Sequence, residues 1–395
     1  MAKEYQHKDL ILALRRPTRE ENQLALFETE EDWRAHWWNM PEFDFANIAP
    51  MHSITINFMT AKDMQDFAQL TGMKLNEESN SKWFPPRKNP KPGQYYFTGP
   101  KSGTRYPVCI PSKGRHDVQR TGKCLDELGV AYKFFVEQHE HDLYVETLGA
   151  DKVVSMPFSN LGQGSIPARN FIWDWAVAQG VERYWLMDDN IMAFGRLCET
   201  RKLRVRGGAF FRAMEDFVDR YENVSIAGPH NYGFANATSA KQPFRLNSRV
   251  YSCSLIKTDL PYRWRGRYNE DTDLCLRMLK DGWCSVLFIS LLMDKMPTAF
   301  SKRGGLKGGN TDSVYNTNDY RLAFAESLQQ QHPEHVKVKW KYNRWHHEVD
   351  YSEFKRNKLK LKPSLTPVAF VNNYGMRLTE KDSATAVNDD YEDDC

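Results

Sequence analysis

The pattern of apolar and polar positions becomes regular from Tyr106 onward. Short apolar runs at 106–110, 131–136, 153–156 and 184–187 alternate with stretches at 119–128 and 168–179 whose apolar residues repeat at helical spacing. Alternating strands and helices predict a parallel sheet with helices on both sides. Gly129 and Gly180 follow the amphipathic stretches and are expected to end the helices. We therefore expect an α/β fold with a mostly parallel central sheet flanked by helices.

The residues before Tyr106 follow another pattern. Glu28 to Trp38 is expected to be helical, and Ser53 to Phe58 alternates like a half-buried strand, with Thr60 capping the next helix. Residues 79–104 are rich in Ser, Asn, Pro, Lys and Gly, which indicates a linker or an exposed loop. The predicted divisions are a helical segment 1–50, a small α+β module with its linker 51–104, the central domain 105–310, a basic and aromatic C-terminal extension 311–380 and a disordered acidic tail 381–395.

Composition narrows the class of protein. The longest apolar run, Val286 to Met293, is far too short to span a bilayer, and the first residues contain no apolar signal segment. The seven cysteines include no CxxC pair, so neither a zinc ribbon nor a disulfide framework is indicated. We expect a soluble, intracellular protein without a membrane partner. The net charge is +3, but six acids and one base lie in 381–395, so the remaining chain is more basic and suits a polyanion partner.

The strongest candidate for chemistry follows the apolar run Tyr184–Met187. Asp188, Asp189 and Asn190 come directly after this predicted strand. Ligands of parallel sheets bind beyond the carboxyl ends of the strands. Two adjacent carboxylates repel each other unless a cation lies between them, which predicts Mg²⁺ or Mn²⁺ and a phosphorylated substrate. The alternative is a polar cap at the start of a helix.

Three other segments suit anionic ligands. Ser112–Arg115 follows the first strand and carries two bases, and Gly162–Asn170 opens a helix with Arg169 in its first turn. Ser301–Asn310 is a glycine-rich basic stretch that suits a lid over a leaving diphosphate. The alternatives are an ordinary turn, an ordinary helix start and a plain flexible loop.

Acids and bases also cluster nearer the C-terminus. Asn269 can cap a helix whose first turn holds Glu270 and Asp271, and either acid could be a general base, although a capped amphipathic helix explains the same pattern. Val336 to Lys362 holds nine bases, three acids and five interleaved aromatic residues, which suits nucleic acid or a solvated amphipathic face. His346 is either a surface residue or a late metal ligand.

Four segments, over roughly residues 105–310, resemble in their order the motifs of GT-A glycosyltransferases. They are Ser112–Arg115, Ala168–Asn170, Asp188–Asn190 and Asn269–Asp271. These enzymes use nucleotide sugars and a divalent metal. The acid pair with its Asn is similar to their DxD motif. Within this fold, Trp185–Ile191 and Asn269–Leu274, with the Gly305–Thr311 stretch, resemble the phage TET/JBP-associated glycosyltransferases, which are thought to glycosylate hydroxymethylated pyrimidines in DNA.

The resemblance implies a site of four parts. The nucleotide sugar, a UDP-sugar by expectation, is assigned to Pro111, Ser112, Lys113, Arg115, Glu137, Arg169, Asn170, Asp188, Lys302 and Arg303. The metal, Mn²⁺ or Mg²⁺, is assigned to Asp188, Asp189, Asn190 and His346. The catalytic acids are Glu270, Asp271 and Asp273. DNA is assigned to Lys337, Lys339, Trp340, Lys341, Arg344 and Trp345.

The implied reaction is the transfer of a hexosyl or pentosyl group to the hydroxymethyl group of 5-hydroxymethylcytosine in phage DNA, in the host cytoplasm. The residues leave alternatives open. These are a GT-A glycosyltransferase with a protein, glycan or lipid acceptor, a nucleotidyltransferase, and a DNA-binding accessory protein with a degenerate site.

Overall fold

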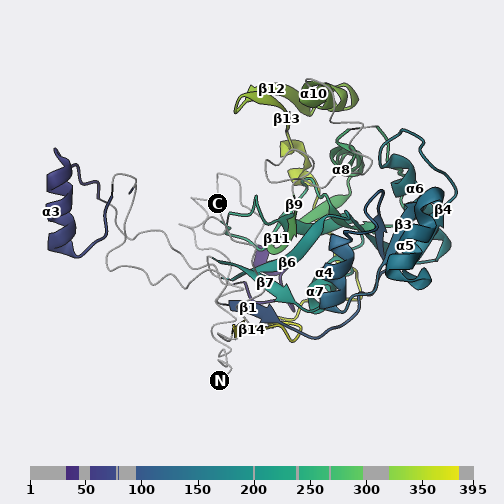
Figure 1. Cartoon of the computed structure of the whole chain (residues 1–395), viewed down its shortest axis with the longest axis horizontal. Coiled ribbons are helices and arrows are strands. Elements are labelled where there is room, and N and C mark those ends of the chain that lie inside the picture. Colours follow the sequence, from purple (N-terminus) through teal and green to yellow (C-terminus); the bar gives the residue numbers. More distant parts are fainter. Residues whose placement is uncertain are drawn as a thin grey trace. The chain divides into compact units, whose positions relative to one another are not determined.

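The computed structural model describes residues 33–43, 54–76, 79, 95–198, 201–236, 240–266, 268–296 and 320–381 (Figure 1). The chain divides into two compact units. The larger contains Met1–Phe45 with Tyr96–Thr379, and the smaller contains Ala46–Tyr95 with Glu380–Cys395. Each unit is described by itself. The predicted acidic tail lies outside the described residues from Asp382 onward.

The smaller unit contains helix α3 (Ala61–Thr71). Its predicted cap is confirmed, because the Thr60 hydroxyl accepts the N–H of Asp63 while the Asp63 carboxylate accepts the N–H of Thr60 at 2.9 Å. The helix ends at Gly72, whose φ of 68° suits glycine. The strand predicted over 53–58 is wrong for its described part, 54–58, since alternation alone provides no partner strand.

Twelve strands among the described residues of the chain form one mixed sheet in the order β14-β1-β7-β6-β11-β8-β10-β5-β2-β3-β4, with β9 paired to β11. The strands are β1 (Tyr95–Thr98), β2 (Val108–Pro111), β3 (Lys133–Glu137), β4 (Val153–Met156), β5 (Arg183–Met187), β6 (Ile191–Cys198), β7 (Arg201–Arg206), β8 (Val224–Asn231), β9 (Phe244–Leu246), β10 (Cys253–Lys257), β11 (Cys284–Lys295) and β14 (Arg377–Glu380). β1 lies inside the stretch that the composition predicts to be a linker.

Helices flank this sheet, which confirms the predicted α/β fold (Figure 1). They are α4 (Arg120–Leu128), α5 (His141–Leu148), α6 (Ile166–Ala178), α7 (Ala209–Val218) and α8 (Glu270–Lys280). β5, β2, β3 and β4 pair in parallel, as their alternation with helices predicts, while β10 lies antiparallel to both β5 and β8. The carboxyl ends of β5, β2 and β3 therefore meet at one edge of the sheet.

The C-terminal extension belongs to the larger unit. It contains α10 (Tyr320–Gln331), the antiparallel hairpin of β12 (Val336–Lys341) and β13 (Arg344–Val349), and the short 3₁₀ helix η4 (Ser352–Arg356). Its apolar side chains form a buried cluster with those of α8, namely Leu276, Leu279, Leu328, Val336 and Phe354. No helix in the described part of the chain is long and apolar enough to cross a membrane.

Candidate active site

The two aspartates after β5 lie at the carboxyl edge of the sheet. Every residue of β5 is buried, so the strand fixes the position of the turn that follows it. The N–H of Asp188 donates to the carbonyl of Ser252 (2.8 Å), and the Thr121 hydroxyl donates to the carbonyl of Asp188 (2.7 Å). The Asp188 side chain is 22% exposed, whereas Asp189 is 9% exposed. The two carboxylates therefore have different surroundings.

Asp188 lies between two cations. Its Oδ2 accepts Lys295 Nζ at 2.6 Å, and its Oδ1 accepts an Arg169 guanidinium nitrogen at 3.2 Å. Burial alone would raise the pKa of Asp188, but the charges of Lys295 and Arg169 outweigh it and lower the pKa to about 2. Asp188 therefore stays ionised at any physiological pH, and it is the more exposed of the two aspartates.

Asp189 instead holds the loop after β2. Its carboxylate accepts the Ser112 hydroxyl at 2.6 Å and forms an ion pair with Arg115. The Tyr144 hydroxyl completes this network, as it lies 2.8 Å from the Ser112 oxygen and accepts the N–H of Arg115 at 3.1 Å. Burial raises the pKa of Asp189 despite the Arg115 charge. Its contacts give Asp189 a positioning role.

Arg169 joins Asp188 to the acids of α8. The same guanidinium nitrogen lies 3.6 Å from Glu270 Oε1, and the guanidinium is stacked 4.7 Å from the ring centre of Trp264. Burial raises the pKa of Glu270, and the neighbouring Asp271 adds to the rise while Arg169 opposes it. The structure thus brings together Asp188, Arg169 and Glu270, which are far apart in the sequence.

The other predicted donor residues lie around the ends of β2, β3 and α6. Lys113 Nζ contacts the Glu137 carboxylate at 2.8 Å and the Asn160 amide oxygen at 2.8 Å, so two predicted residues form a pair. Pro111 ends β2 beside β3. Asn170 exchanges two hydrogen bonds with the backbone of Trp264 (2.8 and 3.0 Å) and so fixes the ring that covers Arg169. Lys302 and Arg303 lie outside the described residues.

Helix α8 begins differently from the prediction. Asn269 makes no side-chain cap, because its φ is 53° and its amide donates to the carbonyl of Phe324 at 2.8 Å. Asp273 is fully buried and contacts Arg265, Arg277 and His332 at 2.8–2.9 Å. Burial would raise the pKa of Asp273, but these donors lower it to about 2. Its contacts join α8 to His332, directly after α10, whereas Glu270 and Asp271 remain at the site.

The donor set at Asp188 fits a divalent ion that is held partly by its substrate. Asp188 supplies an ionised carboxylate, and Asn190 Oδ1 is buried without a hydrogen-bond partner among the described residues. Mg²⁺ commonly takes one or two protein carboxylates and completes its shell with phosphate oxygens and water. No group of three His, Cys, Asp or Glu that could hold a metal occurs within the described ranges. An ion at Asp188 would compete with Lys295 and Arg169 for the carboxylate oxygens.

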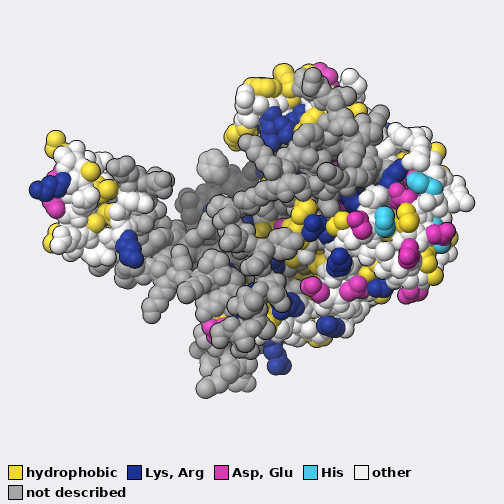
Figure 2. Space-filling view, in the orientation of Figure 1, with side chains coloured by type: hydrophobic (Ala, Val, Ile, Leu, Met, Phe, Trp, Pro, Cys, Tyr) yellow, Lys and Arg dark blue, Asp and Glu magenta, His cyan; other side chains and the backbone are white. Residues whose placement is uncertain are grey.

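The predicted nucleic-acid residues lie on the β12–β13 hairpin, which divides them between two faces. Cross-strand partners share a face, so one face carries the charges Lys337, Lys339, Lys341, Arg344, His346 and Glu348 and the other carries Val336, Val338, Trp340, Trp345, His347 and Val349. Basic side chains gather over this hairpin in Figure 2. His346 contacts Arg344 at 2.9 Å on the charged face. The alternation of basic and aromatic residues in the sequence therefore reflects the two-residue period of a β-strand.

Four residues that contact the site were not expected from the sequence: Lys295, Ser252, Tyr144 and Trp264. Lys295 had a usable signal, because Asp294-Lys295 follows the apolar run 286–293 just as the aspartates follow β5. The other three contact the site from loops or from a helix face without any distinctive sequence pattern.

An α/β sheet with opposed acids and bases at its carboxyl edge is typical of enzymes that bind phosphorylated substrates. Residues 106–305, about half of the chain, match the family TET-Associated Glycosyltransferase. The chain belongs to this family and is a glycosyltransferase.

No curated protein sequence matches the chain. Among solved structures, mannose-6-phosphate isomerase from Helicobacter pylori is similar at 8% identity and a TM-score of 0.22, over 70% of this chain and 100% of that one. A similarity this low carries no argument about fold or function.

Proposed function

We propose that this glycosyltransferase moves a sugar from a nucleotide sugar, a UDP-sugar, to the hydroxymethyl group of 5-hydroxymethylcytosine in phage DNA, using Mn²⁺ or Mg²⁺ and a GT-A-like arrangement of its sheet. The observation that carries the proposal is the contact of Asp188 and Glu270 with one guanidinium, that of Arg169. The family match to TET-Associated Glycosyltransferases supports a modified base as the acceptor.

The proposed roles lie on two sides of Arg169: stabilisation of the leaving diphosphate on one side and orientation of the acceptor hydroxyl on the other. Arg169 and Lys295 present positive charge where a diphosphate leaves, so they stabilise the charge that develops on it. Glu270 or Asp271 orients the acceptor hydroxyl on the other side. The raised pKa of Glu270 makes it a better proton acceptor than an ordinary glutamate.

Sugar transfer forms one carbon–oxygen bond and breaks another. The acceptor oxygen forms a bond to the anomeric carbon of the sugar, and the bond between that carbon and the diphosphate oxygen breaks. The hydroxyl proton passes to Glu270 or Asp271, and the nucleoside diphosphate leaves with the bonding electrons. A divalent ion, held by Asp188 and Asn190, would supply Lewis-acid stabilisation of the leaving diphosphate.

The hairpin supports DNA as the acceptor. Its charged face presents three lysines and Arg344 against Glu348 alone, and bases of this kind neutralise phosphates. Trp340 on the other face is 56% exposed and offers a ring for stacking on a nucleobase.

The test is mass spectrometry of nucleosides after the protein has acted on hydroxymethylated DNA with a panel of nucleotide sugars and Mn²⁺. We expect a sugar on 5-hydroxymethylcytosine, none on DNA with ordinary cytosine, and release of nucleoside diphosphate. Chelation with EDTA should stop the reaction, and added Mn²⁺ should restore it. Release of pyrophosphate would contradict sugar transfer, and transfer to a protein instead of DNA would contradict the acceptor.

A further inference from the structure

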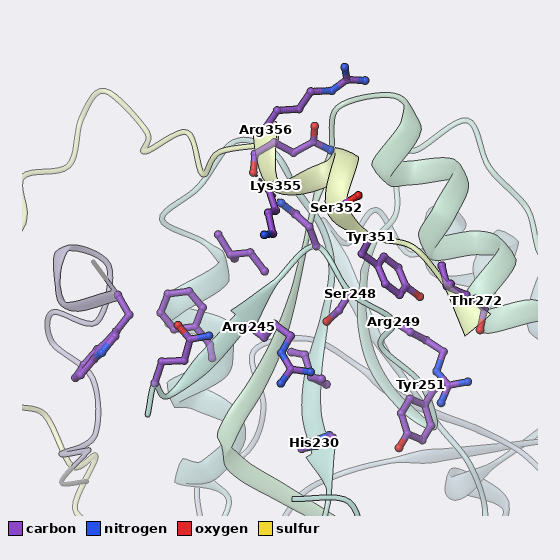
Figure 3. Close-up of a pocket in the computed structure, with 18 of the residues that line it drawn as sticks. His230, Arg245, Ser248, Arg249, Tyr251, Thr272, Tyr351, Ser352, Lys355 and Arg356 are labelled. Carbon is purple, nitrogen blue, oxygen red and sulfur yellow. Dashed lines mark hydrogen bonds between the residues drawn. The ribbon is translucent and has the colours of Figure 1, made fainter. Parts of the chain in front are cut away.

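A large cavity opens within the larger unit (Figure 3). Its volume is about 990 Å³, at the upper end of the range for small-molecule sites. Its described lining includes five Lys or Arg and three His side chains but no Asp or Glu. Aromatic rings, among them Tyr251 and Tyr351, also line it. A wall of bases and rings without acids suits a ligand that is both anionic and aromatic.

Polar side chains also line this cavity. Asn247 Oδ1, Ser248 Oγ and Thr272 Oγ1 have no hydrogen-bond partner among the described residues, and all three residues line the cavity. Asn247 is 5% exposed and Thr272 is fully buried. Unsatisfied buried polar atoms are costly. These three atoms are closed off from solvent, so a ligand meets the bases and rings of the wall first.

The chain connects the cavity directly to the site at Asp188. Tyr251 lines the cavity, and the next residue, Ser252, accepts Lys295 Nζ at 2.9 Å and the N–H of Asp188 at 2.8 Å. On the other side, Thr272 lines the cavity two residues after Glu270, which contacts Arg169. The cavity therefore reaches the first turn of α8, where a base for the acceptor hydroxyl is expected.

Arg249 lies near both of these connections, close to Tyr251 and to the first turn of α8. Its guanidinium is 4.4 Å from the ring centre of Tyr251, and Figure 3 shows the two side chains next to each other. Burial alone would lower the pKa of Arg249, but the negative charges around it, Asp271 foremost, outweigh burial and raise the pKa. Arg245 is exposed at the cavity and has no carboxylate partner among the described residues. An ionised arginine without a carboxylate partner is ready to bind a phosphate.

We propose that this cavity binds one nucleotide of the acceptor strand, with Arg245 on its phosphate, Tyr251 against its base and its hydroxymethyl group directed toward the start of α8. The inference rests on the proposed DNA acceptor. It adds the pocket and the residues that would hold a nucleotide drawn out of the DNA stack.

The test compares binding of two probes by three variants. The probes are a short fluorescent single-stranded DNA with one 5-hydroxymethylcytosine, and UDP. Arg245→Gln removes the phosphate contact, and Ser248→Phe fills the cavity without changing its charge. Arg377→Gln removes an exposed arginine of β14 and serves as the matched control.

We expect Arg245→Gln and Ser248→Phe each to weaken DNA binding by about tenfold or more, with UDP binding unchanged, and Arg377→Gln to bind like the native chain. Loss of UDP binding instead would make the cavity a donor site and overturn the inference. Unchanged DNA binding by Arg245→Gln, a variant of an exposed residue that should fold normally, would overturn it as well. Since the readout is binding, it is independent of the transfer assay that judges the proposed function.

Discussion

At the scale of single residues, the site depends on how two adjacent aspartates are divided between two roles. Asp188 faces Lys295 and Arg169 and stays ionised, while Asp189 is buried against Ser112 and Arg115. The first can act on a ligand, and the second shapes the loop that would receive it. Their order in the sequence does not reveal this division, because it depends on which side chains other elements bring to each carboxylate.

Asp188→Asn should lower the rate of nucleoside diphosphate release by about 100-fold or more. The amide keeps the shape of the side chain but loses the charge that orders Lys295 and Arg169. The measurement is diphosphate release with hydroxymethylated DNA as acceptor. Asp259→Asn is the matched control, as Asp259 is 68% exposed and pairs with Lys257. Native activity in Asp188→Asn would exclude Asp188 from the site.

The acid limb of the pH profile should report Glu270. A raised pKa keeps Glu270 protonated, and so unable to accept a proton, up to a higher pH than an ordinary glutamate. The value of kcat/KM should therefore fall as the pH drops through a pKa above the usual glutamate value of 4.5. The measurement is the pH dependence of kcat/KM for the native chain and for Glu270→Gln. If the limb persists unchanged in Glu270→Gln, another group such as Asp271 is the base.

At the scale of elements, the β12–β13 hairpin places residues that alternate in the sequence on two different faces. Lys339 and Lys341 both form ion pairs with Glu348, so one acid partly neutralises the charged face. The face is therefore less basic than the number of its lysines suggests.

Glu348→Gln should strengthen DNA binding, and Lys337→Gln should weaken it and reduce the slope of log affinity against log salt by about 1. Both effects follow from counterion release at phosphates. Binding is measured by fluorescence anisotropy at several salt concentrations. Glu127→Gln on α4 makes the same change in net charge at another place and should bind like the native chain. An equal gain in the α4 variant would show that only net charge matters.

At the scale of the whole molecule, the C-terminal extension completes the larger unit. The amide of Asn357 donates to the carbonyls of Leu279 (2.7 Å) and Trp283 (3.0 Å), and the amide of Asn247 donates to the carbonyls of Phe354 and Asn357. Through these hydrogen bonds, residues of the C-terminal extension pair with buried polar groups of the α/β core that lie far away in the sequence. The central domain and the extension therefore depend on each other.

A chain that ends after Asp350 should lose at least about 3 kcal/mol of unfolding free energy, because Asn247 and the carbonyls of Leu279 and Trp283 lose buried partners and Phe354 leaves the apolar cluster. Thermal unfolding followed by circular dichroism measures the change. A chain that ends after Lys381 keeps all of these contacts and should unfold like the full chain. Equal stability of the two shortened chains would contradict the structural role of residues 351–381.

The sequence by itself determined the elements whose signals are local. Strand β5, helix α4 with its stop at Gly129 and the helix cap at Thr60 follow from runs, periods and caps within a few residues. It also indicated that the acids after β5 matter, since a buried strand delivers them to the ligand edge of the sheet.

Only the tertiary structure decided which partners those acids have and where the cavity lies. Lys295 reaches Asp188 from β11 and Arg249 reaches the start of α8 from the loop after β9, and no spacing along the chain encodes either meeting. The physical reason is that the partners belong to different elements, which only the packing of the whole sheet brings together. Burial and the nearest opposite charge then set the pKa of each carboxylate, and with it how readily the group takes up a proton.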